Sequence, residues 1–374
     1  MQPRRATLPD AYEPKLRAAL ERRGYSLDEP AKLAQAVLKL SDFYLNNPAG
    51  ATPWHEPWVQ VASLVYFFPL NYARSSLVAR ELTRLGFFEN LELMTDDGAG
   101  MGSAIHAFSD QFATTASSPP IKWKALDVSS DALKMLNELN IGPTRVVTQS
   151  VTGSIREPSQ KEKAGLVASY VFTELKDIPR DWLSFEALVI IEPSTRDDAR
   201  RLQAERKTLM AAGFELWAPC PHQDDCPLLI HGDKDWCHDR VHFDAPAWFS
   251  SIEKHLPMKN RTLTFSYLAA RKSAPPVIAR NMKSDARELV RLVGDHLDEK
   301  GKSRQAVCRS SEKEFLAWFP QRFKAGTFEK EGLEMSRGSL VDLARGLEKK
   351  QMEVRVKTPD QFRELATDER LADS

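Results

Sequence analysis

The first seventy residues place apolar side chains at helical spacing. The apolar positions recur three or four residues apart, at Leu16, Ala19 and Leu20 and then at Leu33, Ala36, Val37 and Leu40. This period predicts short amphipathic helices and a helical N-terminal segment over residues 1–70. A further helix is predicted over Asn71–Leu85, because Gly86 follows it at a position suited to a C-cap.

From residue 91 the pattern changes to short apolar runs separated by helical or loop sequence. The runs are Leu91–Thr95, Ile121–Leu126, Arg145–Thr148, Leu166–Val171 and Ala187–Ile191. Alternating strands and helices on this scale predict an α/β domain with a parallel, doubly wound sheet over residues 71–272. A late run, Thr262–Ala269, is expected to form an antiparallel edge strand of that sheet.

The chain becomes more charged after Pro275 and Pro276. Two runs there, 304–308 and 314–319, have the alternation of strands. We therefore expect a small C-terminal domain that contains β-strands, over residues 273–374.

The composition is typical of a folded, globular chain, and it does not favour nucleic acid or a membrane as a partner. The 374 residues are 42% hydrophobic and 28% charged, with Lys+Arg and Asp+Glu both at 52. A neutral chain offers no overall attraction to nucleic acid, so an RNA partner needs a local basic patch. No membrane partner is expected, because the most apolar stretch, Val61–Leu70, has ten residues and a span needs about 20. Without a secretory signal the expected compartment is the cytoplasm, or the mitochondrion if the source is eukaryotic.

A glycine loop follows the first predicted strand of the sheet. Residues Asp96–Gly102 fit D-x-G-x-G-x-G and lead into a helical run, Ser103–Phe112. Ser103 stands where a dinucleotide fingerprint would have glycine, so the loop favours S-adenosylmethionine, with Asp127 at the next strand end accepting from the ribose hydroxyls. The expected cofactor-binding residues are Asp96, Gly98, Ala99, Gly100, Gly102 and Asp127. The alternative is a glycine turn that only packs a helix on a strand.

Three of the four cysteines crowd into an insert over residues 218–243. Cys220, Cys226 and Cys237 are five or more residues apart, and Cys308 lies seventy residues further on. Four thiolates make up one complete metal site. The wide, irregular gaps favour a 4Fe-4S cluster, with zinc or unligated cysteines as alternatives. Four histidines of the same stretch are alternative ligands: His222, His231, His238 and His242.

Several motifs, in order, resemble the methyltransferase-like assembly factors of the mitochondrial small ribosomal subunit and their bacterial relatives. They are the glycine loop, Ala168–Leu175, Ile191-Glu192-Pro193, the Ala218–His222 block, Trp236-Cys237 and Phe265–Leu268. The resemblance implies a Rossmann-like class I methyltransferase fold and a role on small-subunit ribosomal RNA. It also implies a 4Fe-4S cluster bound by Cys220, Cys226, Cys237 and Cys308.

The donor site is clearer in the sequence than any acceptor site. The segment Ala168–Glu174 lacks the Asn/Asp-Pro-Pro-Tyr/Phe motif of enzymes that methylate base amines, and all four cysteines are assigned to the metal. Tyr170 and Glu174 lie where an acceptor would dock, with a structural role as the alternative. No catalytic residue is assigned, and whether the chain transfers a methyl group stays open.

A basic stretch is the candidate RNA contact. Between residues 254 and 287 eight Lys or Arg residues stand against one acid, Asp285. They are Lys254, Lys259, Arg261, Arg271, Lys272, Arg280, Lys283 and Arg287, and Lys300, Lys302, Arg304 and Arg309 extend the stretch beside Cys308. Such a run can neutralise phosphates. The sequence thus predicts a factor that binds S-adenosylmethionine and acts on small-subunit RNA. The alternatives are a non-catalytic RNA-binding assembly factor and a small-molecule methyltransferase with structural zinc.

Overall fold

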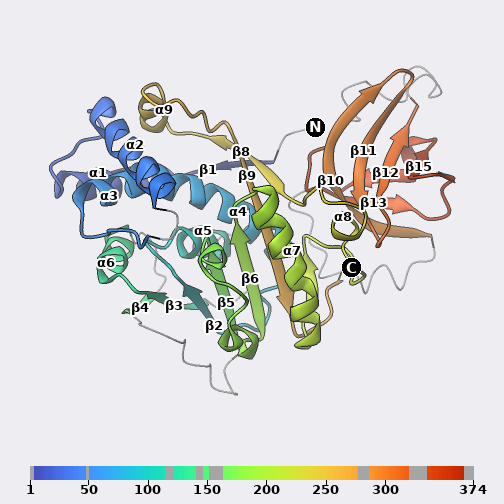
Figure 1. Cartoon of the computed structure of the whole chain (residues 1–374), viewed down its shortest axis with the longest axis horizontal. Coiled ribbons are helices and arrows are strands. Elements are labelled where there is room, and N and C mark those ends of the chain that lie inside the picture. Colours follow the sequence, from blue (N-terminus) through green and yellow to red (C-terminus); the bar gives the residue numbers. More distant parts are fainter. Residues whose placement is uncertain are drawn as a thin grey trace.

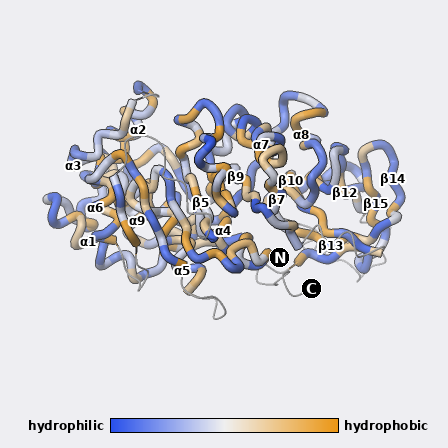
Figure 2. The backbone as a smooth tube through the Cα atoms, turned by 90° about the horizontal axis from the view of Figure 1, so that it is seen from below, coloured by the Kyte–Doolittle hydropathy of each residue, from blue (hydrophilic) through white to orange (hydrophobic). Residues whose placement is uncertain are grey.

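Two β-sheets stand side by side in the computed structural model, a larger one with helices and a smaller one near the C-terminus (Figure 1). The structure describes residues 4–47, 50–113, 121–139, 146–150, 163–276, 286–319 and 335–365. Hydrophobic and hydrophilic segments alternate along the backbone in both parts (Figure 2). Among these residues no helix is both long and apolar enough to cross a membrane.

The N-terminal segment is helical, as predicted, but it begins with a strand. Its elements are β1 (Arg5–Thr7), α1 (Tyr12–Glu21), α2 (Pro30–Asn46), α3 (Pro57–Ala62), the π-helical turn η1 (Ser63–Phe67) and α4 (Phe68–Arg84). The proposed division at residue 70 falls inside α4. β1 pairs in parallel with β8 (Asp239–Asp244), so the N-terminus takes part in the large sheet.

The large sheet contains the strands that the sequence predicted, with shifted ends. Its other elements are β2 (Leu93–Asp97), α5 (Ser103–Ala113), β3 (Lys122–Asp127), α6 (Ser130–Leu139), β4 (Val146–Ser150), β5 (Ala164–Ser169), β6 (Ala187–Glu192), α7 (Arg196–Ala211), β7 (Glu215–Ala218), α8 (Pro227–Ile230), α9 (Ala247–Glu253) and β9 (Thr262–Arg271). Two short 3-10 turns, η2 (Phe172–Glu174) and η3 (Arg180–Ser184), connect β5 to β6.

Hydrogen-bonded neighbours follow the order β1-β8-β9-β6-β5-β2-β3-β4, and β7 also pairs with β9. β9 is antiparallel to β6, as expected, but the prediction that it forms an edge was wrong. Its second side pairs with β7 near Arg271 and with β8 near Thr262, because ten residues are long enough for two partners. The sequence pattern did not reveal the short strands β7 and β8.

Helices cover both faces of this sheet. Successive residues of β6 point to opposite faces, so this strand contributes side chains to the core on each side. Val189 and Ile191 belong to the core that packs under α1 to α6. Leu188 and Ile190 belong to the core on the opposite face, together with Leu202 of α7. A strand buried on both faces reads as a continuous apolar run, which is why β6 was predicted with nearly correct ends.

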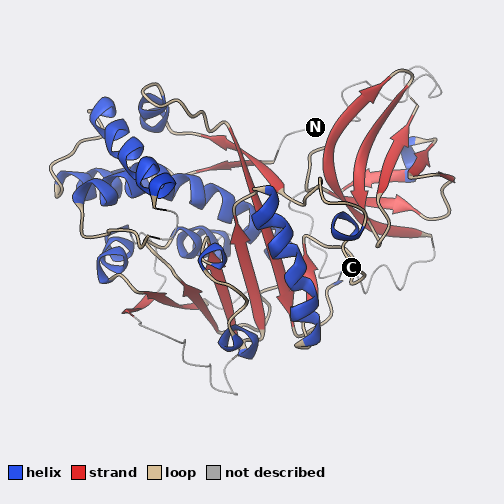
Figure 3. Ribbon diagram, in the orientation of Figure 1, coloured by secondary structure: helices blue, strands red, loops and turns tan. Residues whose placement is uncertain are grey.

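The C-terminal part is a twisted sheet with its own core (Figure 3). Its strands are β10 (Arg287–Glu299), β11 (Lys302–Cys308), β12 (Glu314–Trp318), β13 (Leu340–Ala344), β14 (Lys349–Lys350), β15 (Glu353–Val356) and β16 (Phe362–Glu364), with the 3-10 turn η6 (Pro359–Gln361). Their order is β14-β15-β12-β11-β10-β13-β16. The β-containing domain was therefore predicted, but only β11 and β12 were located.

Buried contacts join the two parts. Leu289 and Leu340 of the small sheet belong to the core of the large one. Beside them, Arg4 donates to both carboxylate oxygens of Asp239 at 2.5 and 2.6 Å. Arg291 of β10 pairs with Glu81 of α4, which also pairs with Arg84 at 2.8 Å. Burial opposes the ionisation of Glu81, yet Arg291, Arg84 and Arg4 together hold its pKa well below the usual range.

Candidate functional site

The glycine loop lies where β2 ends, between the ends of β3 and β5, and each glycine has a positive φ. Gly98, Gly100 and Gly102 have φ of 67°, 53° and 77°. A Cβ on Gly98 would come within 2.4 Å of Val171, and one on Gly102 within 2.7 Å of Leu136. At Gly100 the nearest atom would belong to Trp54, at 3.7 Å. Two glycines thus allow tight packing, and the middle one leaves room for a ligand.

Asp127 holds the loop from the end of β3. One carboxylate oxygen accepts from Gly100 N at 2.7 Å and the other from Ser129 N at 2.7 Å. A carboxylate offers about four acceptor positions, so this one keeps capacity for further donors. Burial raises the pKa of Asp127. The structure brings the predicted ribose acceptor and the predicted loop together.

Asp96 lies deeper, with 1% of its surface exposed. Its Oδ1 has no hydrogen-bond partner among the described residues. Burial, and then Asp97 and Asp127, raise the pKa of Asp96 well above its usual range. A buried carboxylate without a partner is costly unless a donor or cation reaches it. This oxygen fits a ligand with a cationic group.

The far side of the loop contains Tyr170, Glu174 and a residue that sequence reasoning had quoted only as part of a motif, Glu192. Tyr170 has φ of 62°, a strained value for a non-glycine residue. Glu192 Oε1 accepts from Val171 N at 3.1 Å and Phe172 N at 2.8 Å, and Thr173 also faces this carboxylate. Burial raises the pKa of Glu192 to about 7 against these donors.

Glu174 lies near the glycine loop. Burial, and then the charge of Asp127, raise its pKa. Burial, and to a smaller extent the charge of Glu174, raise the pKa of Tyr44. Tyr44 of the N-terminal segment therefore lies near Glu174. The predicted acceptor side is therefore bounded by this segment and by η2.

The four cysteines converge from both parts of the molecule. Cys220 follows β7, Cys226 precedes α8, Cys237 precedes β8, and Cys308 ends β11. All four are free thiols, and three are buried. Burial, and then the thiols of Cys220, Cys237 and Cys226, raise the pKa of Cys308 well above its usual range. The sequence predicted this set of four, although seventy residues separate the last two.

The donor chemistry of this cluster fits a thiolate-bound metal, but the side chains are not arranged around one ion. Within the part of the chain that the structure describes, no three His, Cys, Asp or Glu residues form a group that could hold a metal ion. Arg206 stands beside the thiols, and the charges of Cys220, Cys226 and Cys308 raise its pKa against burial. A cation there favours thiolates.

Arginines of α7, which sequence reasoning missed, hold the cysteine-rich loop by its carbonyls. Arg200 donates to Leu228 O at 2.7 Å, Asp235 O at 2.8 Å and Gly232 O at 3.0 Å. Arg206 donates to Asp224 O at 2.5 Å and His222 O at 3.4 Å. Their spacing gave no signal, because residues six apart lie about 120° apart around a helix and do not share one face.

Of the four candidate histidines, His222 lies against a cysteine. Its Nε2 is 3.2 Å from Cys308 Sγ, and burial lowers its pKa to about 4. His231 Nε2 is 2.9 Å from Ser311 O, His238 faces Arg337, and His242 faces Thr262. His222 is thus the histidine that the structure brings closest to the thiols.

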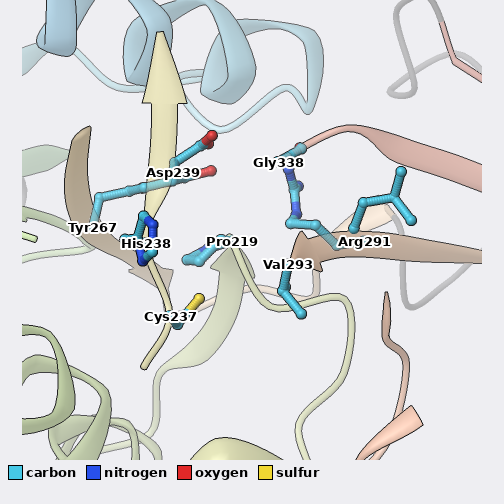
Figure 4. Close-up of a pocket in the computed structure, with 9 residues that line it drawn as sticks. Pro219, Cys237, His238, Asp239, Tyr267, Arg291, Val293 and Gly338 are labelled. Atoms are coloured by element: carbon cyan, nitrogen blue, oxygen red, sulfur yellow. Dashed lines mark hydrogen bonds between the residues drawn. The ribbon is translucent and has the colours of Figure 1, made fainter. Parts of the chain in front are cut away.

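A small pocket adjoins the cysteines between the two sheets (Figure 4). Cys237, His238 and Tyr267 line one side, and Arg291 with Gly338 the other. The Tyr267 hydroxyl is buried without a hydrogen-bond partner among the described residues. The pocket lies beside the buried ion pairs that join the two parts.

The described residues of the basic stretch over 254–287 do not form one patch. Arg261 and Arg271 flank or end β9, and ten strand residues separate them by about 30 Å. Arg271 is 8% exposed and donates to Phe87 O at 2.8 Å. Lys272 donates to Leu183 O, and Arg280 and Lys283 lie outside the described residues. The prediction of a single RNA-binding patch there was wrong, because β9 carries part of the stretch through the core.

The strand order and the glycine loop together define the class of protein. Counting from β2, the parallel strands run 3-2-1-4-5, the antiparallel strand β9 lies beside β6, and β7 pairs on the far side of β9. The loop lies at the switch point of this order, where such folds bind their ligands. This is the Rossmann-like class I methyltransferase fold.

Comparison with known families identifies the chain further. The family described as mitochondrial small ribosomal subunit Rsm22 matches residues 62–317. The chain belongs to this family, which confirms the resemblance seen in the sequence. Among curated proteins none matches the chain.

Solved structures that resemble the chain do so distantly. A putative RNA methyltransferase from Pyrococcus horikoshii is 13% identical, with 54% of this chain and 81% of that chain covered and a TM-score of 0.30. A SAM-dependent methyltransferase from Aquifex aeolicus is 20% identical, covering 38% and 83%, with a TM-score of 0.28. A putative S-adenosylmethionine-dependent methyltransferase from Listeria monocytogenes is 12% identical, covering 53% and 100%, with a TM-score of 0.30.

Proposed function

We propose that this protein binds S-adenosylmethionine and acts on the RNA of the small ribosomal subunit during ribosome assembly or translation. The observation that carries the proposal is the Asp96 carboxylate oxygen, which has no partner among the described residues and stands at the start of a glycine loop with room for a ligand at Gly100. S-adenosylmethionine has a cationic amino group and sulfonium, two ribose hydroxyls and a carboxylate. The site offers the buried Asp96 carboxylate to a cationic group and the Asp127 carboxylate to the ribose hydroxyls. The N–H groups of Ala99, Gly100 and Gly102 already donate within the protein.

The cofactor supplies an activated methyl group, and the chain supplies alignment. Asp127 would hold the ribose while keeping Gly100 N in place. Asp96 would stay ionised once a cation lies beside it, because the positive charge offsets the cost of burial. Whether an RNA base is methylated depends on the region around Tyr170 and Glu174. A non-catalytic assembly factor with the same site remains the second candidate, since Ala168–Glu174 lacks the base-amine motif.

We further propose that Cys220, Cys226, Cys237 and Cys308 bind a 4Fe-4S cluster, with zinc as the alternative. The support is a set of four free thiols that converge beside Arg206. A bound metal would reverse the effect of burial and ionise the thiols. Because Cys308 comes from the small sheet and the others from the large one, ligation would also hold the two parts together.

The cofactor proposal is tested by calorimetry with S-adenosylmethionine. Asp127→Asn should weaken binding about tenfold or more, because a charge-assisted hydrogen bond is lost. Asp131→Asn is the matched control, since Asp131 lies four residues away and pairs with exposed Lys134. Absence of binding to the unaltered protein, or equal affinity in both variants, would refute the assignment.

The metal proposal is tested by iron and zinc assays with absorption spectra after anaerobic purification. Cys308→Ser should lower the metal content and the resistance to proteolysis between the two sheets, since ligation free energy is also folding free energy. Cys220→Ala should do the same, and the double variant should be little worse than either alone. Full metal content in Cys308→Ser would instead assign the fourth position to His222.

Experiments in cells that lack the protein distinguish an RNA-methylating enzyme from a non-catalytic assembly factor. Loss of one methyl group from small-subunit RNA, restored by the unaltered chain but not by Asp127→Asn, would establish an enzyme. Defective subunit profiles with unchanged RNA methylation would establish an assembly factor. Normal profiles and normal methylation would contradict both.

A further inference from the structure

The C-terminal sheet has a strand order suited to binding oligonucleotides. β10, β11 and β12 form an antiparallel meander, β15 joins β12 in parallel, and β13 returns to pair with β10. This is the order of the OB-fold, a partly open barrel whose second and third strands often bind nucleic acids. Fold likeness alone does not assign a function, so the residues on these strands must carry the argument.

The outer face of β11, β12 and β15 carries basic and aromatic side chains in register. One row across four strands consists of Leu297, Arg304, Ala317 and Arg355. The neighbouring row on the same face contains Phe315. The alternate residues point inward, and Gln305, Leu316 and Val354 are buried. The small Ala317 of the outer row is buried as well, between its larger neighbours. Leu297 is 44% exposed, so this end of the face is open.

Arginines lie over the rings of this face. Arg304 stands 4.8 Å from the Phe315 ring centroid, and Arg355 stands 5.4 Å from that of Phe319. Both rings are half-buried. Arg355 Nε has no hydrogen-bond partner among the described residues. Unpaired bases stack on aromatic rings and on guanidinium planes, and here each ring supports a guanidinium that can stack on a base or neutralise a phosphate.

The acids near these cations form partly buried ion pairs with them, with 19–29% of each basic side chain exposed. Lys302 pairs with Glu353 and Glu299, Arg304 with Glu299, and Arg355 with Glu348. Water reaches these pairs, so salt screens them in part and phosphates can compete with the carboxylates. The same β11 residues belong to the basic extension beside Cys308 seen in the sequence, and unlike Arg271 they lie on an outer face.

We propose that the face formed by Lys302, Arg304, Phe315, Phe319 and Arg355 binds single-stranded RNA. This deepens the proposed function, on which it rests, by naming where the RNA is bound and in which form. Single strands are favoured over duplex because a ring stacks on a base only when that base is unpaired.

The test measures binding of full-length protein to a labelled polyuridine strand of roughly a dozen nucleotides, followed by fluorescence anisotropy at several salt concentrations. Phe315→Leu with Phe319→Leu should weaken binding about tenfold or more, because stacking is lost. Arg304→Gln with Arg355→Gln should reduce the slope of log affinity against log salt by about 1.4, for two phosphates released from a single strand. Thermal unfolding and S-adenosylmethionine binding should stay unchanged in both.

Arg363→Gln is the matched control, since Arg363 lies on β16 at the far edge of the same sheet. It should leave both affinity and salt slope as they are. Unaltered affinity in the folded phenylalanine variants, or equal affinity for a hairpin duplex, would overturn the inference. If the unaltered protein sediments with small subunits but ignores the single strand, the inference fails and the proposed function stands. Failure of the unaltered protein to bind S-adenosylmethionine would count against the proposed function instead.

Discussion

Gly338 lies where the chain passes the buried pair of Arg4 and Asp239. Its φ is 85°, and a Cβ would lie 1.8 Å from Arg4 Nη1 and 2.2 Å from Asp239 Oδ1. Backbone strain and displacement of buried charge coincide at this one position. Gly346 has a similar φ of 71° but nothing within 4 Å of its would-be Cβ. Substitution of Gly346 therefore tests backbone strain alone, whereas substitution of Gly338 tests backbone strain together with displacement of the buried ion pair.

We expect Gly346→Ala to destabilise the fold by about 1–2 kcal/mol, the cost of a left-handed backbone for alanine. Gly338→Ala should cost more, by about 3 kcal/mol or above, because it also separates a buried ion pair. Urea unfolding of the two variants checks this. Equal losses would show that the Arg4–Asp239 pair tolerates displacement.

Glu192 makes stability depend on pH. Because burial raises its folded pKa to about 7, the folded state holds a proton between about pH 4.5 and 7 that the unfolded state has released. The contribution of Glu192 should therefore fall as pH rises through this window, by up to about 3 kcal/mol. Glu192→Gln should remove that part of the pH dependence. Urea unfolding at about pH 5 and about pH 8 measures it, and parallel curves for both proteins would contradict it.

At the scale of elements, α7 organises the cysteine-rich loop. Arg200 and Arg206 bind five loop carbonyls between them. The helix packs by Leu202 and Leu209 on the sheet, so the loop is held by a rigid support. Preorganisation of this kind places the thiols close together before any metal binds, which lowers the entropy cost of ligation.

Arg206→Gln should therefore lower both metal content and thermal stability. The buried carbonyls would lose a charged donor, worth about 1.5–3 kcal/mol, and the thiolates would lose a neighbouring cation. Lys207→Gln is the control, because Lys207 is exposed and pairs with exposed Asp225. If Arg206→Gln kept full metal content, the loop would be held by Arg200 or by the metal itself.

At the scale of the molecule, charge joins the two sheets. Glu81 of the large part faces Arg291 of the small part, and both are almost fully buried. Glu81→Gln should cost about 3–5 kcal/mol, because the buried guanidinium of Arg291 would lose the carboxylate that neutralises it. Glu89→Gln is the control, because Glu89 is exposed, and it should leave the free energy of unfolding unchanged. Unfolding followed by tryptophan fluorescence reports both parts, since Trp217 and Trp318 lie one in each. Unchanged unfolding of Glu81→Gln would mean that the apolar contacts suffice.

Local sequence determined the features that depend on neighbours along the chain. Strands buried on both faces, such as β6, appear as apolar runs, and the glycine loop appears because sharp turns need glycine at φ values that other residues avoid. Asp96 and Asp127 could be proposed as cofactor-binding residues because they lie at or next to strand ends. The same reasoning located only two strands of the small sheet, whose other strands are short or polar on one face.

Tertiary structure alone decided what depends on residues far apart. Arg4 pairs with Asp239 across 235 positions, β1 joins the large sheet, and β9 becomes an inner strand because β7 and β8 reach its free side. Arg271 looked like an RNA contact in the sequence and proved buried, while Arg304 and Arg355 came together with two rings only through strand register. The charge pattern and the hydrophobic periodicity of a sequence indicate its local secondary structure and its candidate functional residues. Which groups lose water and which stay exposed depends on the packing of the whole chain.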